Sequence, residues 1–297
     1  MRFLYTLITY AAYPLLLGFG MLNLWLLTPS LGDAAALVSI IATVALMAVF
    51  EAIHPYTRSW RRPWRESKHD WALNLFGAIV PTELVNATIL VVLGTLAGHV
   101  SAAVGGTLWP GTWPFVAQFM LALLVAEFVV YWGHRALHEV EYLWRFHSVH
   151  HSADRLYWLN ANRVHPVESL VVYLPTIAVF TVLGCPLEVL KAWSVFAGVH
   201  GILQHLNVRV ALGKLNYLLS TPDLHRRHHS RKRELADCNY GAVLIIWDII
   251  FRTRHELAPD HDLNDLGVEG DLPFRPAVTS MLLSPFVPGS NHKPESR

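Results

Sequence analysis

Charged residues are scarce in this sequence. Asp, Glu, Lys and Arg make up 15% of its 297 residues, and hydrophobic residues make up 53%. Soluble proteins carry about 25% charged residues, and the mean hydropathy here is +0.35. The composition therefore disfavours a soluble protein and indicates a membrane protein. With a net charge of +1 and no nucleic-acid motif, nothing predicts DNA or RNA as a partner.

Cysteine is almost absent, and the motifs of several enzyme classes are missing. Cys185 and Cys238 are the only cysteines, which excludes a cysteine-rich zinc site and gives little reason to expect a disulfide scaffold. The sequence contains neither GxGxxG nor the haem-attachment motif CxxCH. The protease motif HExxH is also missing, because Tyr142 stands where a second histidine would follow His138 and Glu139. A metalloprotease is disfavoured, and a redox enzyme would receive its electrons from a separate protein.

Six apolar runs are candidates for membrane helices, which need about 20 apolar residues to cross a bilayer. Four are long, at 3–27, 35–53, 71–97 and 115–132. Two shorter runs, 170–183 and 187–203, are either short spans, a re-entrant hairpin or buried helices beneath a site. The first run is too long and too poorly flanked for a signal peptide. We therefore predict an all-α protein, a polytopic membrane helix bundle with four to six spans.

A basic loop between the second and third runs predicts the orientation. Such loops remain in the cytoplasm under the positive-inside rule. Its basic residues are Arg58, Arg61, Arg62, Arg65 and Lys68. If each pair of runs forms a hairpin, every histidine cluster falls on the same, cytoplasmic side. The sequence thus predicts a multi-pass protein of the bacterial inner membrane or endoplasmic reticulum, with a cytoplasmic helical cap.

Histidine is the abundant reactive side chain. Of 17 histidines, 11 fall between His134 and His229. Eight of them form one HxxxH pair and two HxxHH triplets: His134 and His138; His147, His150 and His151; His225, His228 and His229. Residues three and four apart share a helix face, so each cluster can direct two imidazoles into one cavity. Eight nitrogens are too many for one metal and suit two, with positions left open for oxygen.

The remaining histidines have a simpler interpretation. A lone histidine near a membrane boundary is usually an interfacial polar residue, and a single HxxxH pair is often structural. Three clusters, two of identical form, indicate metal binding instead. The histidines interpreted as interfacial are His54, His69, His99, His255, His261 and His292.

The motifs resemble one known family. The ordered segments HRALH, HSVHH and HRRHH, closing with NYGAVLIIWD at 239–248, resemble the fatty acid hydroxylase / sterol desaturase superfamily over roughly 72–251. The stretches TPDLHRRHHS and NANRVHPVE resemble its sterol-desaturase-like branch. The resemblance implies a cytoplasm-facing non-haem di-iron centre, with two Fe ions, O2 as co-substrate and electrons from a cytochrome b5-like or ferredoxin-like protein. It also implies His165 and His205 as metal ligands, with His200 as an alternative near His205.

Acidic residues near the clusters are candidates to orient the ligands. Metal-bound histidines usually donate their second N–H to a carboxylate or carbonyl. The candidates are Asp154, Glu168, Asp223, Asp237 and Asp248, each of which could equally be a surface acid or a helix cap. Glu127 lies seven residues before His134, on roughly the same helix face. An acid within a span suggests function, although a hydrogen bond to another helix is the plainer account.

These features predict an O2-dependent hydroxylase or desaturase that oxidises an unactivated C–H bond of a lipid within the bilayer. We favour hydroxylation as the simpler outcome, and expect no catalytic residue beyond the metal ligands. The competing classes are a histidine-rich metal-binding or transport protein, which would place histidines along its spans, and a structural membrane protein with vestigial ligands. The expected organisation is an N-terminal transmembrane hairpin and basic loop at 1–70, an oxygenase domain at 71–255 and a partly disordered cytoplasmic tail at 256–297.

Overall fold

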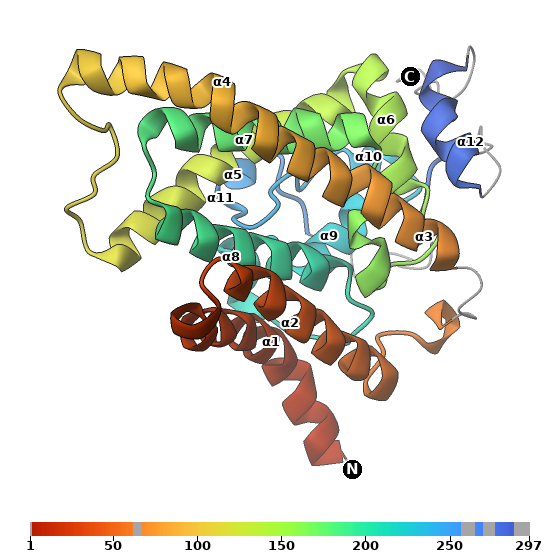
Figure 1. Ribbon diagram of the computed structural model, residues 1–297. Coiled ribbons are helices and arrows are strands. Elements are labelled where there is room, and N and C mark those ends of the chain that lie inside the picture. Colours follow the sequence, from red (N-terminus) through yellow and green to blue (C-terminus); the bar gives the residue numbers. More distant parts are fainter. Residues whose placement is uncertain (1, 62–66, 257–264, 270–276, 288–297) are drawn as a thin grey trace.

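The computed structural model describes residues 2–61, 67–256, 265–269 and 277–287 (Figure 1). This part of the chain is helical and contains no strand, only three isolated β-bridges. The predicted all-α class is confirmed. Arg62 and Arg65 of the basic loop, and His261 and His292, lie outside the described residues.

One layer of the bundle consists of three long helices. Helices α1 (Arg2–Leu31) and α2 (Ala34–Ile53) make a hairpin that packs against α8 (Leu187–His205). Their shared core includes Leu16, Met47 and Val199, which are fully buried. Gly20 permits the close approach, since a Cβ there would lie 3.0 Å from Val199 Cγ2. Small residues have this role wherever membrane helices pack closely.

A second layer consists of α4 (Val80–Val104), α5 (Phe115–Glu139) and α7 (Pro166–Leu183). Helix α7 packs between α4 and α5, and α5 also contacts α8 (Figure 1). The predicted run 71–97 is divided here into α3 (Lys68–Leu73), a π-helical segment η3 (Asn74–Ile79) and α4. At Gly77 a Cβ would lie 2.0 Å from the carbonyl oxygen of Val164, so only glycine fits at this position.

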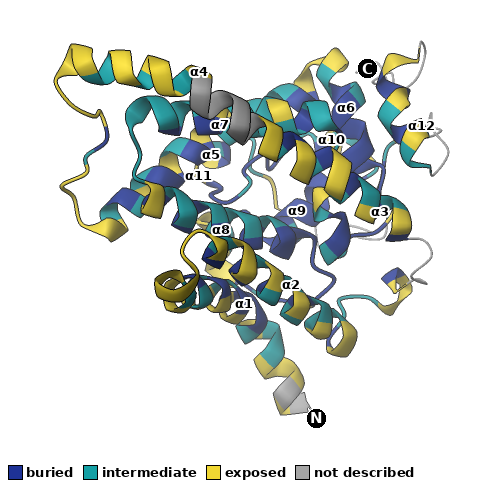
Figure 2. Ribbon diagram, in the orientation of Figure 1, coloured by how far each residue is buried: buried dark blue, intermediate teal, exposed yellow. Residues whose placement is uncertain are grey.

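Four helices are long and apolar enough to cross a membrane: Tyr5–Leu31, Ala34–Ile53, Phe115–Glu139 and Pro166–Leu183. Among the described residues, the predicted runs 71–97 and 187–203 do not meet these criteria. Large apolar side chains on these helices face outward, as at Trp25 and Leu37, which are 72% and 62% exposed. Exposed residues also line α4, whereas buried ones gather around the short helices (Figure 2). This is the surface of a membrane protein, with lipid in place of water around the long helices.

Short helices build a cap where α2, α5 and α8 end and α7 begins (Figure 1). The cap helices are η1 (Arg58–Trp60), α6 (Glu141–His151), η4 (Trp158–Asn162), η5 (Gly213–Tyr217), α9 (Pro222–His228), α10 (Arg233–Ala236), α11 (Ile246–Ile250), α12 (Val278–Leu283) and η6 (Ser284–Phe286). An isolated bridge between Pro55 and Val208 brings the start of the basic loop beside the cap. The basic loop and the cap therefore lie on the same side of the helix bundle.

The expected C-terminal tail is only partly described. Residues 257–264, 270–276 and 288–297 lie outside the described residues. Within the rest, α12 and η6 form a short helical unit, and Phe286 contacts Phe146 of α6 with ring centroids 5.6 Å apart. This part of the tail therefore packs on the cap.

Candidate metal centre

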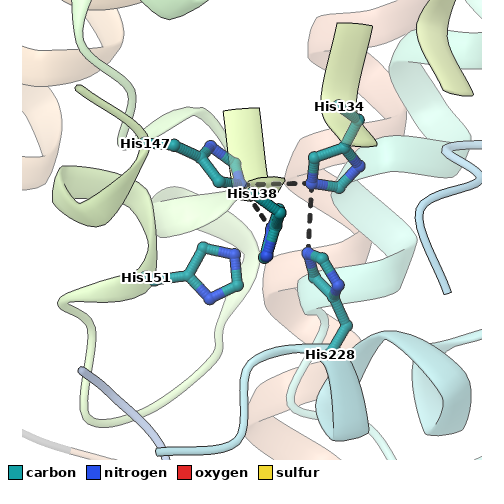
Figure 3. A group of neighbouring side chains, drawn as sticks. All are labelled: His134, His138, His147, His151 and His228. Atoms are coloured by element: carbon teal, nitrogen blue, oxygen red, sulfur yellow. Dashed lines mark hydrogen bonds between the residues drawn. The ribbon is translucent and has the colours of Figure 1, made fainter. Parts of the chain in front are cut away.

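Nine buried or half-buried histidines converge in the cap as two groups. The first contains His134, His138, His147, His151 and His228 (Figure 3). The second contains His150, His205, His225 and His229. Within each group, the atoms available as ligands all lie within 4.8 Å of one another. Nine of the ten predicted ligands thus come together from four separate helical segments.

Each HxxHH triplet is divided between the two groups. In α6, His147 and His151 belong to the first group, while His150 between them belongs to the second. In the α9 segment the division is reversed, because His225 and His229 join the second group and His228 the first. The i, i+4 pairs share a helix face, as the spacing predicts. The intervening histidine is turned about 100° away, and reaches the neighbouring group.

Ring nitrogens within each group have the spacing of ligands on one ion. In the first group, Nε2 of His134 is 3.1 Å from Nε2 of both His147 and His228 (Figure 3). In the second group, Nε2 of His225 is 2.9 Å from that of His205 and 3.1 Å from that of His229. Two nitrogens at right angles on an ion, each about 2.1 Å from it, lie about 3.0 Å apart. The donor set therefore fits two metal ions.

Backbone carbonyls hold two ligands of the first group from behind. His134 Nδ1 lies 2.8 Å from the Tyr240 carbonyl oxygen, and His228 Nδ1 lies 2.7 Å from that of Cys238. A carbonyl only accepts hydrogen bonds, so each Nδ1 carries the proton and donates it. The lone pair of each Nε2 is then directed into the group, as metal binding requires.

Polar side chains lie against three further ligands. His138 Nδ1 lies 3.0 Å from Asp237 Oδ1, and His147 Nδ1 lies 2.9 Å from Glu168 Oε1. In the second group, His205 Nδ1 lies 3.1 Å from Asn160 Oδ1. Asn160 was not anticipated, although it lies in the NANRVHPVE stretch. Its contact joins residues 45 positions apart, and no local pattern reveals such a pair.

Burial keeps these imidazoles neutral. It lowers the pKa of His147, His151 and His225 well below the usual 6.5, and neighbouring histidines lower it further. The pKa of His150 falls to about 3, again mainly through burial. In the described part of the chain neither ring nitrogen of His151 has a hydrogen-bond partner. An unsatisfied buried polar group costs about 1–3 kcal/mol, and a metal ion would satisfy this one.

The two carbonyls that accept from His134 and His228 belong to the loop at 238–243. Two acidic side chains accept hydrogen bonds from the backbone of this loop. Glu127 of α5 accepts hydrogen bonds from the backbone N–H groups of Ala242 and Val243. Asp248 of α11 accepts from those of Tyr240 and Gly241, each at 2.8 Å. Glu127 therefore bonds the loop backbone, whereas the plainer account from the sequence was a hydrogen bond to another helix.

The other candidates lie farther from the ligands. Asp223 pairs with Arg226 at 2.9 Å, and Asp154 is exposed. His165 lies outside both groups because it caps α7: its Nδ1 accepts from the Val167 N–H, and its Nε2 lies 3.2 Å from the Leu282 carbonyl oxygen. His200 is also outside them. It is fully buried, and its ring contacts Tyr13 and Phe196 instead.

Comparison with known proteins gives one family model and several relatives. The model described as fatty acid hydroxylase matches residues 119–253. The chain is similar to ornithine lipid hydroxylase OlsE of Rhizobium tropici, with 35% identity over 233 residues, or 77% of this chain and 70% of that protein. It is 36% identical to alkylglycerol monooxygenase of Homo sapiens over 49% of this chain and 31% of that protein. For methylsterol monooxygenase 2-2 of Arabidopsis thaliana the identity is 30%, over 46% and 52%. No solved structure shows a significant match.

Proposed function

Since the chain belongs to the fatty acid hydroxylase / sterol desaturase superfamily and is a membrane-bound oxidoreductase, we propose that it hydroxylates a polar membrane lipid at a di-iron centre. The two adjacent groups of five and four histidines carry this proposal. Imidazole suits iron, zinc, copper and nickel, and family membership favours iron. His134, His138, His147, His151 and His228 would hold one ion, and His150, His205, His225 and His229 the other.

The chain's own residues supply the surroundings for the reaction. When bound, the iron pair supplies the reduction of O2 and the oxidising power that breaks an unactivated C–H bond. The protein buries the ligands away from water and keeps them neutral. Asp237 and Glu168 lie against His138 and His147, where their carboxylates would offset part of the charge of a bound metal. Orientation of the ligands, exclusion of water and alignment of the lipid are the protein's contribution.

The substrate is proposed as a lipid that remains in the bilayer. The relatives named above act, by their names, on ornithine lipids, alkylglycerols and methylsterols. Their names are those of hydroxylases and monooxygenases, so hydroxylation is preferred to desaturation. A very-long-chain aldehyde decarbonylase of rice is also 29% identical over 46% of the chain, so the family extends beyond hydroxylation. Reducing equivalents would come from a separate electron-transfer protein.

Orientation and the competing class follow from where the histidines lie. All nine gather at one end of the bundle, His134 and His138 in the last turns of α5 and the others at the end of α8 or in the cap, an arrangement that favours an enzyme over a transporter. Arg58 and Arg61 lie on the same side as the cap. Under the positive-inside rule this side faces the cytoplasm, where soluble electron donors are available.

Metal analysis joined to lipid analysis tests the proposal. Purified protein is expected to hold two iron ions per chain, and expressing cells to contain a lipid that is heavier by one oxygen atom than in cells without the gene. Incorporation of label from 18O2 would identify the oxygen source. A lipid lighter by two hydrogens would indicate the desaturase instead. Purified protein that binds no metal, with all nine histidines intact, would contradict the proposal.

A further inference from the structure

One arginine of α9 is fully buried. Arg226 directly follows the candidate ligand His225, and its side chain has no exposed surface. Burying a guanidinium away from water costs free energy unless its charge and its N–H groups find partners. Arginine always carries its charge, and its N–H donors have a fixed, planar arrangement. The contacts of Arg226 therefore indicate why this charge is buried here.

These contacts connect α9 to the end of α8. Nη1 of Arg226 donates to Asp223 Oδ1 at 2.9 Å. Nη2 donates to the carbonyl oxygens of Leu206 and Val208, at 3.0 and 3.1 Å. Leu206 directly follows His205, the last residue of α8 and a candidate ligand of the second group. Arg226 thus joins the segment that carries one ligand of the second group to the segment that carries another.

The two ligands beside these contacts are close together. Nε2 of His205 lies 2.9 Å from Nε2 of His225, the spacing of two nitrogens on one ion. Helix α9 has only seven residues, and helices this short are not stable without outside contacts. Gln204 makes another link between the same segments, since its Nε2 donates to the Ser220 carbonyl oxygen at 2.9 Å. The position of His225 relative to His205 therefore depends on contacts between these segments, and Arg226 makes two of them.

A third segment, from the N-terminal hairpin, contacts the same guanidinium. The guanidinium carbon of Arg226 lies 4.1 Å from the centre of the Tyr56 ring, a cation–π contact that is stronger where water is excluded. Tyr56 lies three residues after the end of α2, and its N–H donates to the Asn207 carbonyl oxygen at 3.1 Å. The isolated bridge between Pro55 and Val208 holds the same segments together. Arg226 thus contacts three segments that are far apart in the sequence.

The first histidine group is supported differently. His228 is its ligand from α9, and the Cys238 carbonyl oxygen lies 2.7 Å from His228 Nδ1. That carbonyl belongs to the loop at 238–243. The hydrogen bonds of Arg226 within the described residues go to Asp223 and to the segment after α8 instead. Loss of Arg226 would therefore displace ligands of the second group and leave the support of the first in place.

We propose that Arg226 is a positioning residue for the metal ion of the second group, and that its contact with Tyr56 makes this ion depend on the N-terminal hairpin. The residues that the family model matches begin at 119, so the hairpin lies outside them. This inference rests on the proposed function, because it takes the second group to be a metal site. It adds a residue that sets the affinity for one ion only, and a link from the hairpin to that ion.

Cobalt binding to proteins with a single site tests this inference. His228→Ala should keep only the ion of the second group, and His229→Ala only that of the first. Metal-free protein in detergent is titrated with Co2+, whose visible absorption reports the arrangement of its ligands. We expect Arg226→Met to lower the Co2+ affinity of the His228→Ala protein by about 100-fold, the upper end of what side chains outside the ligand set contribute. In the His229→Ala protein the affinity and the absorption should both stay unchanged.

Two milder changes separate positioning from folding. Arg226→Lys keeps the charge and can donate to one carbonyl, but it lacks the planar arrangement of donors. It should therefore restore part of the affinity, leaving a loss of about tenfold in the second group. Tyr56→Leu removes the cation–π contact and should lower the same affinity by about three- to tenfold. It should have no further effect in the Arg226→Met protein, since the contact is already lost there.

Two other arginines provide controls. Arg254 makes the same kinds of contact elsewhere in the cap: its guanidinium donates to the Asn216 carbonyl oxygen at 3.1 Å and to Glu256 at 3.0 Å, and lies 4.0 Å from the centre of the Tyr217 ring. Arg254→Met should leave both Co2+ affinities unchanged. Arg209 also faces the Tyr56 ring, at 5.5 Å, and Arg209→Gln should likewise change neither affinity.

The outcomes separate this inference from the proposed function. An unchanged second group in Arg226→Met, or an equal loss from both groups in Arg226→Lys and Tyr56→Leu, would overturn the inference and leave the proposed function standing. An equal effect of Tyr56→Leu with and without Arg226 would contradict the link to the hairpin. Protein that binds Co2+ in neither single-site background would contradict the metal centre, and with it both the function and the inference.

Discussion

The two histidine groups differ in how many of their rings the protein holds by hydrogen bonds. In the first, the outer nitrogens of three of the five rings have a hydrogen-bond partner, Tyr240, Asp237 or Cys238, and that of His147 lies 2.9 Å from Glu168 Oε1 in an ion-pair contact only. In the second, among the residues that the structure describes, only His205 has such a partner, Asn160. The outer nitrogens of His150, His225 and His229 have no hydrogen-bond partner in the described part of the chain. The protein therefore orients more rings of the first group than of the second, which depends more on its ion.

The largest effect is expected from removing neighbouring ligands that serve different groups. His228→Ala should remove the ion of the first group and His229→Ala that of the second, because each loses one donor of five or four. Each variant should retain about one iron per chain by elemental analysis and lose lipid oxidation entirely. His255→Ala, an exposed histidine outside both groups, is the matched control. Two full equivalents of iron in His229→Ala would refute the assignment of that residue.

A smaller effect is expected from the groups behind the ligands. Glu168→Gln should lower the affinity of the first group for its ion by about 10- to 100-fold, the usual effect of removing the side chain that contacts a ligand histidine. Asn160→Ala should lower only the affinity of the second group for its ion. The loss should be smaller, since an amide makes a weaker hydrogen bond to a histidine than a carboxylate does. Chelator titrations that follow both irons measure the two affinities. If either variant lowered the metal affinity of both groups equally, the assignment of Glu168 to the first group and Asn160 to the second would be wrong.

The smallest effect is expected from pH, and it applies to the metal-free protein. Burial lowers the pKa of the cap histidines, that of His150 to about 3. Between about pH 6.5 and pH 3 the unfolded chain binds more protons than the folded one, so stability falls as the pH falls through this window and is level above it. Thermal unfolding of metal-free protein from pH 8 to pH 5 measures this. A midpoint that rises on acidification would contradict burial of neutral histidines.

Short-range spacing predicted the eight histidines of the motifs, because residues three and four apart on a helix meet without help from the rest of the chain. His205 came only from family resemblance, since nothing near it repeats. His165 stands apart from both groups because a local interaction, its cap on α7, occupies the ring. Asp154 and Asp223 are near the motifs in sequence but not near the ligands in space.

Long-range contacts could not be predicted. Glu127 reaches Val243 across 116 positions, and the Tyr240 carbonyl reaches His134 across 106. Such pairs exist only once the helices have packed. The interruption of the run 71–97 has the same origin, because Gly77 lies against the backbone of Val164 in a different element.

The division of each HxxHH triplet has a consequence for the distance between the two ions. His150 and His151 are neighbours on one helix, as are His228 and His229 in the other segment, yet each neighbour serves a different group. Successive residues of an α-helix differ by about 100° in direction and about 1.5 Å in height. The geometry of two helical segments would thus set the separation of the two ions. Among the described residues, neither group includes a carboxylate that could be shared between them. Removing one ion would leave the position of the other unchanged.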